Sequence, residues 1–288
     1  PDGIETCDGR DQDGDGLIDE GLDCGAVPVV AYLATSQRGE TSHDEDEIRE
    51  ELSRVNELFT LGGESILRFE LAEIRPWVED EALALTDAGF TRLALDPRLL
   101  RPAFHVPVFF TDRIESEGGV PRVGVSTLPN GTCGGVHWGT SPELGLVAVA
   151  KGRAPTTLAH ELGHFLGLCH THETRADAPV ATSMNDGARS ACGDGCTFEG
   201  DGVCDTPHDP GPPACSYDAR CGSRCERGDE PETDNLMSYY TGCRSRFSPE
   251  QVSRMQHTLA LRRGWQPCLG GACACTLGAA GCPPEMSC

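Results

Sequence analysis

Four histidines and a glutamate crowd into residues 160–172, which read HELGHFLGLCHTH. On a helix, residues four apart lie one turn apart on nearly the same face, so His160 and His164 can present two imidazoles to one metal ion. Glu161 lies roughly 100° around the helix from them and can reach a water on the metal without becoming a ligand. This is the H-E-x-x-H arrangement, in which zinc acidifies the water and the glutamate accepts its proton.

A third ligand in this segment requires the helix to end. Six residues beyond His164, a continuing helix would turn His170 roughly 240° away from the metal. Gly167 stands where a residue with a left-handed backbone could end the helix and turn the chain back. Three neutral imidazoles would then leave one position open for water, as a catalytic zinc requires. His172 could replace His170 only if the turn were two residues longer, and the spacing favours His170.

Two other interpretations of the segment are weaker. A thiolate is a good zinc ligand, but Cys169 adjoins His170 and would compete with the geometry just described, which favours a disulfide or a buried thiol. A helix with solvent-facing or core histidines is the alternative for the whole segment. Five fixed positions rarely match by chance in one chain, so we prefer the metal site.

Composition and charge indicate an extracellular protein. The 16 cysteines are even in number and cluster at the chain ends and between Cys192 and Cys243. This density fits an oxidising compartment, where crosslinks brace loop-rich segments. A formal net charge of −23 argues against nucleic acid or an anionic membrane as partner. No apolar run is long enough to span a bilayer, so we expect a secreted, soluble chain.

Residues 1–25 form an acidic segment that could bind calcium. Its candidate ligands are the carboxylates of Asp11, Asp13, Asp15, Asp19 and Glu20. The first three alternate and precede Gly16, like the first half of a calcium loop, but Leu22 occupies the position of the closing Glu. The stretch resembles Asp-rich calcium repeats with Cys7 and Cys24 as the clasp. A solvated acidic linker is the alternative, and a thiolate that blocks zinc is the alternative to the clasp.

Alternating strands and helices are expected to carry the metal site. A buried strand is predicted at residues 27–33, followed by a helix that Ser42 and Glu45 begin with a capping box. The apolar stripe of this helix comprises Ile48, Leu52, Val55 and Leu58. Further strands are predicted at 66–74, 106–110, 120–127 and 144–150. The pattern indicates an α/β or α+β sandwich.

The second half of the chain has little periodicity until a final helix. Gly, Pro, Asp and Cys dominate from residue 171 to 233, where disulfides and a metal could act as braces. The final helix has Ser248 as its cap, Pro249 at its first position and Gln251 completing the box. Its buried stripe comprises Val252, Met255 and Leu259. We therefore divide the chain into an acidic segment (1–25), a main domain (26–265) and a cysteine-rich tail (266–288).

The chain resembles a known family of zinc enzymes. The spacing His160-Glu161-x-x-His164-x-x-Gly167-x-x-His170 is that of the metzincin metalloproteases. The segment DNLMSYY looks like their Met-turn, with Met237 as the apolar floor beneath the zinc. The stretches GDGVCDTPHDPG and RFSPEQVSRMQ resemble the pappalysin branch, to which ulilysin belongs. The similarity covers roughly residues 26 to 265.

The resemblance implies a fold and a mechanism. The fold has a twisted mixed sheet, an active-site helix, the Met-turn and a C-terminal helix. Zinc on the three histidines would polarise a water and the scissile carbonyl, Glu161 would move the proton and Tyr239 would stabilise the oxyanion. An extended peptide or protein substrate would lie along a sheet edge, which we expect residues 123–127 to supply.

The resemblance also concerns the loop that precedes the Met-turn. It implies that Asp205 and its neighbours in residues 200–207 bind calcium and that cysteines lock this loop to the Met-turn. The cysteines are Cys204, Cys215, Cys221, Cys225 and Cys243, with partners unassigned. Two departures stand out: no acid follows Tyr239 in YYTGC, which argues against selection of Arg or Lys, and His172 replaces the aromatic usual in the family.

Three classes of function fit these features. The first is a secreted, calcium-stabilised zinc endopeptidase. The second is a calcium-dependent extracellular binding or adhesion protein built on a protease scaffold, and the intact Glu161 counts against it because a binder needs no general base. The third is a zinc hydrolase for non-peptide amides.

Overall fold

The computed structural model describes a central domain. It covers residues 25–99, 104–116, 119, 121–128, 145–172, 201–203 and 205–264. The acidic segment and the tail lie outside these residues, so the expected division of the chain stays a prediction. Within the described ranges, no helix has both the length and the apolar character needed to cross a membrane.

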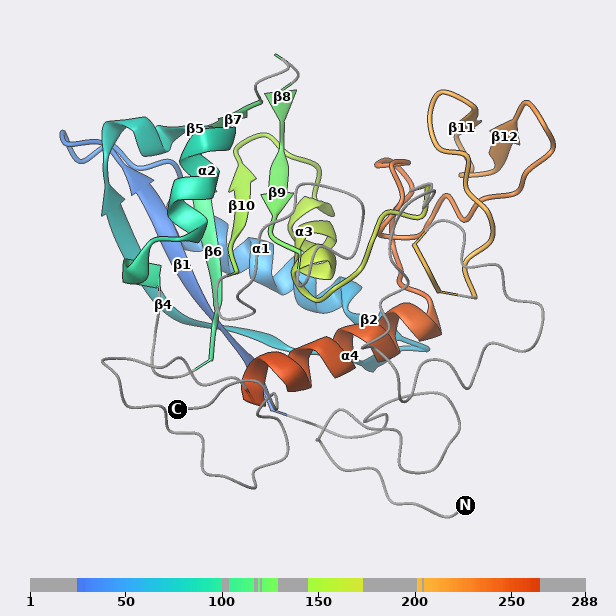
Figure 1. Ribbon diagram of the computed structural model, residues 1–288, viewed down its shortest axis with the longest axis horizontal. Coiled ribbons are helices and arrows are strands. Elements are labelled where there is room, and N and C mark those ends of the chain that lie inside the picture. Colours follow the sequence, from blue (N-terminus) through green and yellow to red (C-terminus); the bar gives the residue numbers. More distant parts are fainter. Residues whose placement is uncertain are drawn as a thin grey trace, which may run out of the picture.

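A five-stranded sheet forms the centre of the domain (Figure 1). Its order is β4 (Phe69–Val78), β1 (Val27–Thr35), β6 (Val106–Thr111), β10 (Val147–Ala150) and β9 (Gly124–Ser126). The first four strands are parallel, whereas β9 runs antiparallel to β10 and forms one edge. Parallel strands covered on both faces require nearly continuous apolar sequence, as β1 and β6 have.

Strand β1 shows how the sheet separates two apolar cores. Alternate side chains of a strand point to opposite faces. One set enters the larger core: Val27, Val29, Ala31 and Leu33. The other enters the smaller core: Val30, Tyr32 and Ala34. Because both faces are buried, a slip of the strand by one residue would exchange the two sets.

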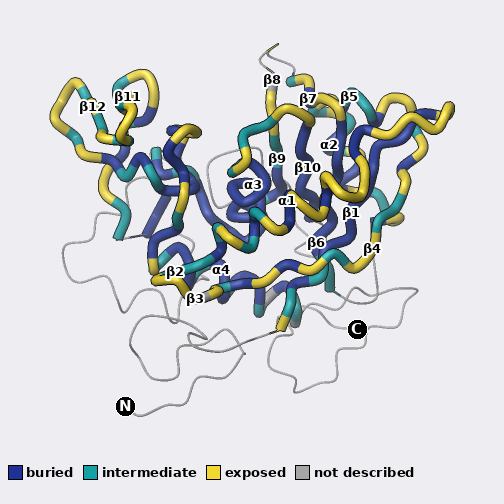
Figure 2. The backbone as a smooth tube through the Cα atoms, turned by 180° about the vertical axis from the view of Figure 1, so that it is seen from behind, coloured by how far each residue is buried: buried dark blue, intermediate teal, exposed yellow. Residues whose placement is uncertain are grey.

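Three helices cover the larger core. They are α1 (Glu45–Leu58), α3 (Thr157–Phe165) and α4 (Pro249–Gly264). Helix α2 (Asp87–Ala94) covers the opposite face, between two short 3-10 turns at Asp80–Leu83 and Pro97–Leu99. Figure 2 shows the strands β1, β6 and β10 and helix α3 as buried along most of their length. The metal-binding motif therefore sits on an element fixed by apolar packing.

Short strands complete the described structure. A small sheet contains β5 (Ala84–Thr86), β7 (Arg113–Glu115) and β8 (Pro121–Arg122). Two hairpins pair β2 (Thr60–Leu61) with β3 (Glu64–Ser65), and β11 (Cys215–Tyr217) with β12 (Ser223–Cys225). The second hairpin projects at the end of the molecule opposite β4, with much of its chain exposed (Figures 1 and 2).

The start of α1 corrects one prediction. The cap is Asp44, whose carboxylate accepts a hydrogen bond from the Glu47 backbone N–H at 2.8 Å, while the Glu47 carboxylate accepts one from the Asp44 N–H at 2.8 Å. Ser42 instead donates to the carbonyl oxygen of Phe110 at 2.8 Å and is buried. Both residues precede a glutamate by three positions, and the tertiary contact of Ser42 with β6 decides between them.

Two strand predictions also need correction, whereas the last helix is confirmed. Strand β4 starts three residues later than expected and extends to Val78; because it is an edge strand, it tolerates Pro76. Within the single strand expected at 120–127, the structure has two short strands, β8 and β9, which belong to different sheets. At the start of α4, Ser248 and Gln251 make the expected reciprocal cap. The Ser248 N–H donates to Oε1 of Gln251 at 3.0 Å, and the Gln251 N–H donates to Oγ of Ser248 at 3.3 Å.

Candidate metal centre and active site

Helix α3 ends where the metal site needs it to end. All its residues are buried. Gly167 has a left-handed backbone with φ of 91°. Its N–H donates to the His164 carbonyl at 2.9 Å, and the Leu168 N–H donates to the Gly163 carbonyl at 2.9 Å. This pair of bonds is a Schellman motif, and it turns the chain so that His170 returns to the helix.

The expected three histidines come together. One ligand atom from each of His160, His164 and His170 lies within 4.8 Å of the others, and no other such group of His, Cys, Asp and Glu occurs in the described ranges. The Nε2 atoms of His164 and His170 are 2.9 Å apart. Backbone carbonyls of Leu236 and Leu168 accept from Nδ1 of His160 and His164, at 2.7 and 2.8 Å. These bonds place the proton on Nδ1 and leave each Nε2 lone pair for a cation.

Electrostatics keep two of these imidazoles neutral, those of His160 and His170. Burial lowers the pKa of His160 well below its ordinary value, helped by the neighbouring imidazoles and Arg244. Burial, with His172 and Arg244, lowers the pKa of His170 to about 3. Neutral imidazole is the form that binds zinc, so the cluster fits the metal.

The carboxyl of Glu161 is enclosed beside the edge strand β9. Its side chain is buried, and a Cβ atom added to Gly124 would lie only 2.5 Å from its Oε1. Burial raises the pKa of Glu161 to about 8, and the cations Arg244 and Arg122 oppose that rise. Because Gly124 has no side chain, the carboxyl of Glu161 can lie directly against the edge strand.

The Met-turn lies against the active-site helix. Met237 is fully buried, and a Cβ atom added to Gly163 would lie 2.6 Å from its Sδ. Its N–H donates to the side-chain oxygen of Asn235 at 2.9 Å. Tyr239 is half exposed, and its ring centroid lies 4.6 Å from that of His170. Met237 therefore lies against α3 and Tyr239 beside the histidines, and the roles that the resemblance gives them stay predictions.

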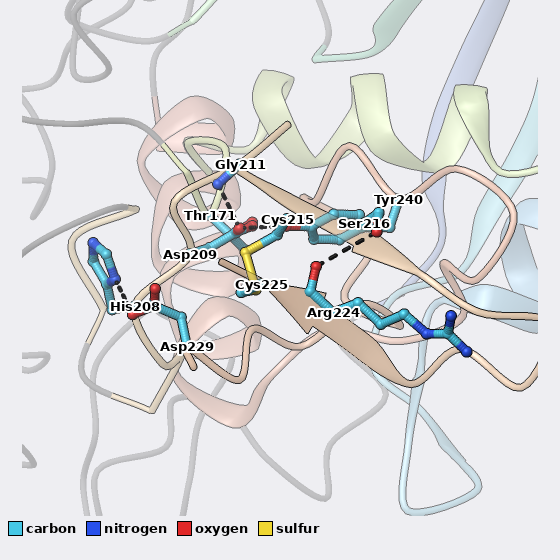
Figure 3. The surroundings of a disulfide bond; sticks show 10 residues. All are labelled: Thr171, His208, Asp209, Gly211, Cys215, Ser216, Arg224, Cys225, Asp229 and Tyr240. Atoms are coloured by element: carbon cyan, nitrogen blue, oxygen red, sulfur yellow. Dashed lines mark hydrogen bonds and ion pairs between the residues drawn. A yellow bond between two sulfur atoms is a disulfide. The ribbon is translucent and has the colours of Figure 1, made fainter. Parts of the chain in front are cut away.

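Asp209 ties the turn carrying His170 to the Met-turn (Figure 3). Its Oδ2 accepts from the Thr171 hydroxyl at 2.6 Å, and its Oδ1 accepts from the Tyr240 hydroxyl at 2.7 Å and the Gly211 N–H at 2.8 Å. The carboxylate is buried. The sequence analysis missed Asp209, because an Asp before Pro and Gly indicates only a turn.

Disulfides brace the same region. Cys221 bonds Cys243, which joins the loop to the segment after the Met-turn as the resemblance implied, and Cys215 bonds Cys225 across the β11–β12 hairpin. Cys169 is also buried in a disulfide, as expected of a residue that is not a zinc ligand. Cys204 lies outside the described residues.

Asp205 has a structural role at the start of α4. Its carboxylate accepts from the Ser248 hydroxyl at 2.6 Å and from the Glu250 N–H at 2.8 Å. Whether it also binds calcium stays a prediction. The other candidate calcium ligands lie outside the described residues: Asp11, Asp13, Asp15, Asp19 and Glu20.

Two further side chains border the histidines. His172 stacks on His170, with ring centroids 5.1 Å apart, and lies outside the three-histidine group. Arg244 is only 7% exposed, and its Nε donates to the Thr156 hydroxyl at 3.1 Å, directly before α3. No motif in the sequence indicated Arg244, since its position near α3 depends on the path of the chain after the Met-turn.

Comparison with known proteins agrees with this site. The family model for pregnancy-associated plasma protein-A, peptidase M43, matches residues 106–260. Over 101 residues the chain is 34% identical to an "Extracellular metalloprotease" of Arthroderma benhamiae and, separately, of Trichophyton verrucosum. Each alignment covers 35% of this chain and 28% of the relative.

Solved structures give weaker likenesses. A chain from "Structure of a chaperone-substrate complex" has a TM-score of 0.39 and 14% identity, over 82% of this chain and 35% of that one. Metalloproteinase-II from Bacteroides fragilis has a TM-score of 0.34 and 15% identity, over 53% of this chain and 46% of that one.

The family match and the architecture together confirm the expected fold class, a mixed α/β metzincin-type domain with a C-terminal helix. The matched residues 106–260 make up more than half of the 288 in the chain and contain the three histidines, Glu161 and the Met-turn. The chain therefore belongs to the pappalysin family, peptidase M43.

Proposed function

We propose that the chain is a secreted endopeptidase that cuts peptide bonds with zinc held by His160, His164 and His170 and with Glu161 as general base. The observation that carries this proposal is the cluster of three imidazoles, two of them buried and the third partly buried, next to the enclosed carboxyl of Glu161. A bound zinc would supply Lewis acidity toward a water and the scissile carbonyl.

The chain's own residues then have distinct tasks. Burial raises the pKa of the Glu161 carboxyl above its ordinary value, which makes its carboxylate a stronger base for a proton that it can return to the leaving amine. Tyr239, half exposed beside the histidines, is placed to donate a hydrogen bond to the developing oxyanion. The edge strand β9 offers backbone groups to an extended substrate, and Gly124 lets that backbone pass close to Glu161.

Secretion and calcium binding belong to the same proposal. The relatives are named extracellular, and the described disulfides need an oxidising compartment. Calcium on the acidic segment 1–25 would stabilise a part of the chain that flanks the catalytic domain 26–265, and calcium on Asp205 would stabilise the loop 200–207 within that domain. A calcium chelator that spares zinc should then lower the melting temperature, and an unchanged value would remove calcium from the proposal.

Glu161→Gln tests the catalytic role. The amide keeps the shape but cannot accept the proton, so kcat/KM on an unfolded protein substrate should fall by about 10²–10⁴-fold. Zinc content and melting temperature should stay unchanged. Glu81→Gln is the matched control, because Glu81 is an exposed glutamate far along the chain from the site. Unchanged turnover in Glu161→Gln would refute the role, and a zinc-loaded native protein that binds but never cuts would favour a binding function.

A further inference from the structure

Arg244 is a nearly buried cation for which the described residues supply no ion pair. It is 7% exposed, and in the described parts of the chain its guanidinium forms no ion pair, only the hydrogen bond to Thr156. Arginine is rarely buried unless it is paired, because removing the charge from water is costly. Arg153 follows that rule, since its side chain is only 8% exposed and lies 3.2 Å from the carboxylate of Glu51.

The start of helix α3 adds to the positive charge around Arg244. Thr156 is the N-cap, but its side chain makes no bond to the helix backbone and accepts from Arg244 instead. The first turn of α3 contains no acidic residue. The positive end of the helix dipole is therefore next to a guanidinium, an arrangement that an anion would stabilise.

The groups within electrostatic range of Arg244 are those of the active site. They are the carboxyl of Glu161 and the hydroxyl of Tyr239, together with the imidazoles of His160 and His170. Glu161 and Tyr239 are the two side chains to which the proposed function assigns the proton transfer and the stabilisation of the oxyanion. A substrate group that reaches Arg244 must therefore belong to a residue near the cut.

We propose that Arg244 selects substrates with a carboxylate next to the cleaved bond. The carboxylate can be the side chain of Asp or Glu or the terminal carboxylate of a peptide, because a guanidinium fork binds either in two parallel hydrogen bonds. This inference rests on the proposed function. It names the substrate class for a site in which no acid follows Tyr239 in YYTGC to attract basic residues.

Matched peptide pairs test the proposal and separate the two sources of carboxylate. Two pairs carry Glu or Gln directly before or directly after the cleaved bond, and a third pair ends shortly after it as the free acid or the amide. For the native enzyme we expect at least one acidic member to have a kcat/KM about tenfold higher than its neutral partner. The preferred pair identifies the source.

Variants assign the preference to Arg244. The ratio of kcat/KM between the acidic and the neutral member of the preferred pair should fall to about one in Arg244→Gln and in Arg244→Met. Arg246→Gln is the matched control two residues away, because Arg246 is far more exposed and already pairs with Glu232 and Asp234 at 2.8 Å. It should keep the native ratio. Melting temperature and zinc content show that each variant is folded.

A binding measurement keeps this inference distinct from the proposed function. The dissociation constants of the same peptide pairs are measured with Glu161→Gln protein, which needs no turnover. If native protein cuts both members of every pair equally, and both bind equally, the role of Arg244 is overturned while the proposed function stands. If nothing is cut, the proposed function fails, and a preference in binding that Arg244→Gln abolishes would still support the carboxylate site. A Glu preference that survives Arg244→Gln would overturn it.

Discussion

The two parts of the molecule that supply the active site are held together by different forces. Helix α3 brings His160, Glu161 and His164, and it packs through apolar side chains against the sheet and helices α1 and α4. The segment 205–247 brings the Met-turn and supports His170, and it depends on buried hydrogen bonds such as those of Asp209 and on two disulfides.

This difference has consequences for how the site tolerates change. Apolar packing is non-directional, so a lost contact weakens the whole domain without moving one ligand. The hydrogen bonds of a buried carboxylate are directional, and its loss leaves each of its donors buried without an acceptor. We therefore expect the two parts to fail in different ways: the sheet part through stability, and the segment 205–247 through the metal site.

Leu52→Ala should give the largest loss of stability. Leu52 is buried on α1 in the larger core, and truncation of a core leucine costs about 2–5 kcal/mol. Urea unfolding of the zinc-loaded protein measures the loss. The zinc dissociation constant of the folded variant should match that of the native protein. A large change in zinc affinity would contradict the division between the two parts.

Asp209→Ala should cost about 2 kcal/mol in stability but weaken zinc binding by about 10–100-fold. The reason is that Thr171, next to His170, and Tyr240 both lose their buried acceptor. Competition with a chromogenic chelator measures the affinity. Asp229→Ala is the control, since Asp229 is only partly buried and its carboxylate lies 3.3 Å from the imidazole of the exposed residue His208. Equal zinc affinity in both variants would show that Asp209 does not position the third ligand.

His43 makes the sheet part sensitive to acid. Burial, assisted by Arg153, lowers its pKa from 6.5 to about 4. Because the unfolded chain binds this proton more readily, stability is full above pH 6.5 and falls as the pH approaches 4, by about 2 kcal/mol at pH 5. His43→Phe should flatten this part of the curve of unfolding free energy against pH. A curve unchanged in slope between pH 6.5 and 5 would contradict the assignment.

The features that the sequence predicted are those set by local spacing. The ligands on α3, its end at Gly167 and the cap of α4 by Ser248 and Gln251 depend on residues within a few positions of one another. Asp209 and Arg244 could not be predicted, because the side chains that they bind lie 31 or more positions away along the chain. For the same reason the choice of Asp44 over Ser42 was missed, since Ser42 bonds a residue 68 positions distant.

The most direct test of the central claim is digestion of a proteome-derived peptide library by the native protein, with cut sites identified by mass spectrometry. Samples are compared without chelator, with a zinc chelator, and with zinc restored. We predict cuts at internal bonds that disappear with the chelator and return with zinc. Folded, zinc-loaded protein that cuts nothing, or cuts that persist unchanged in the chelator, would contradict a zinc-dependent endopeptidase.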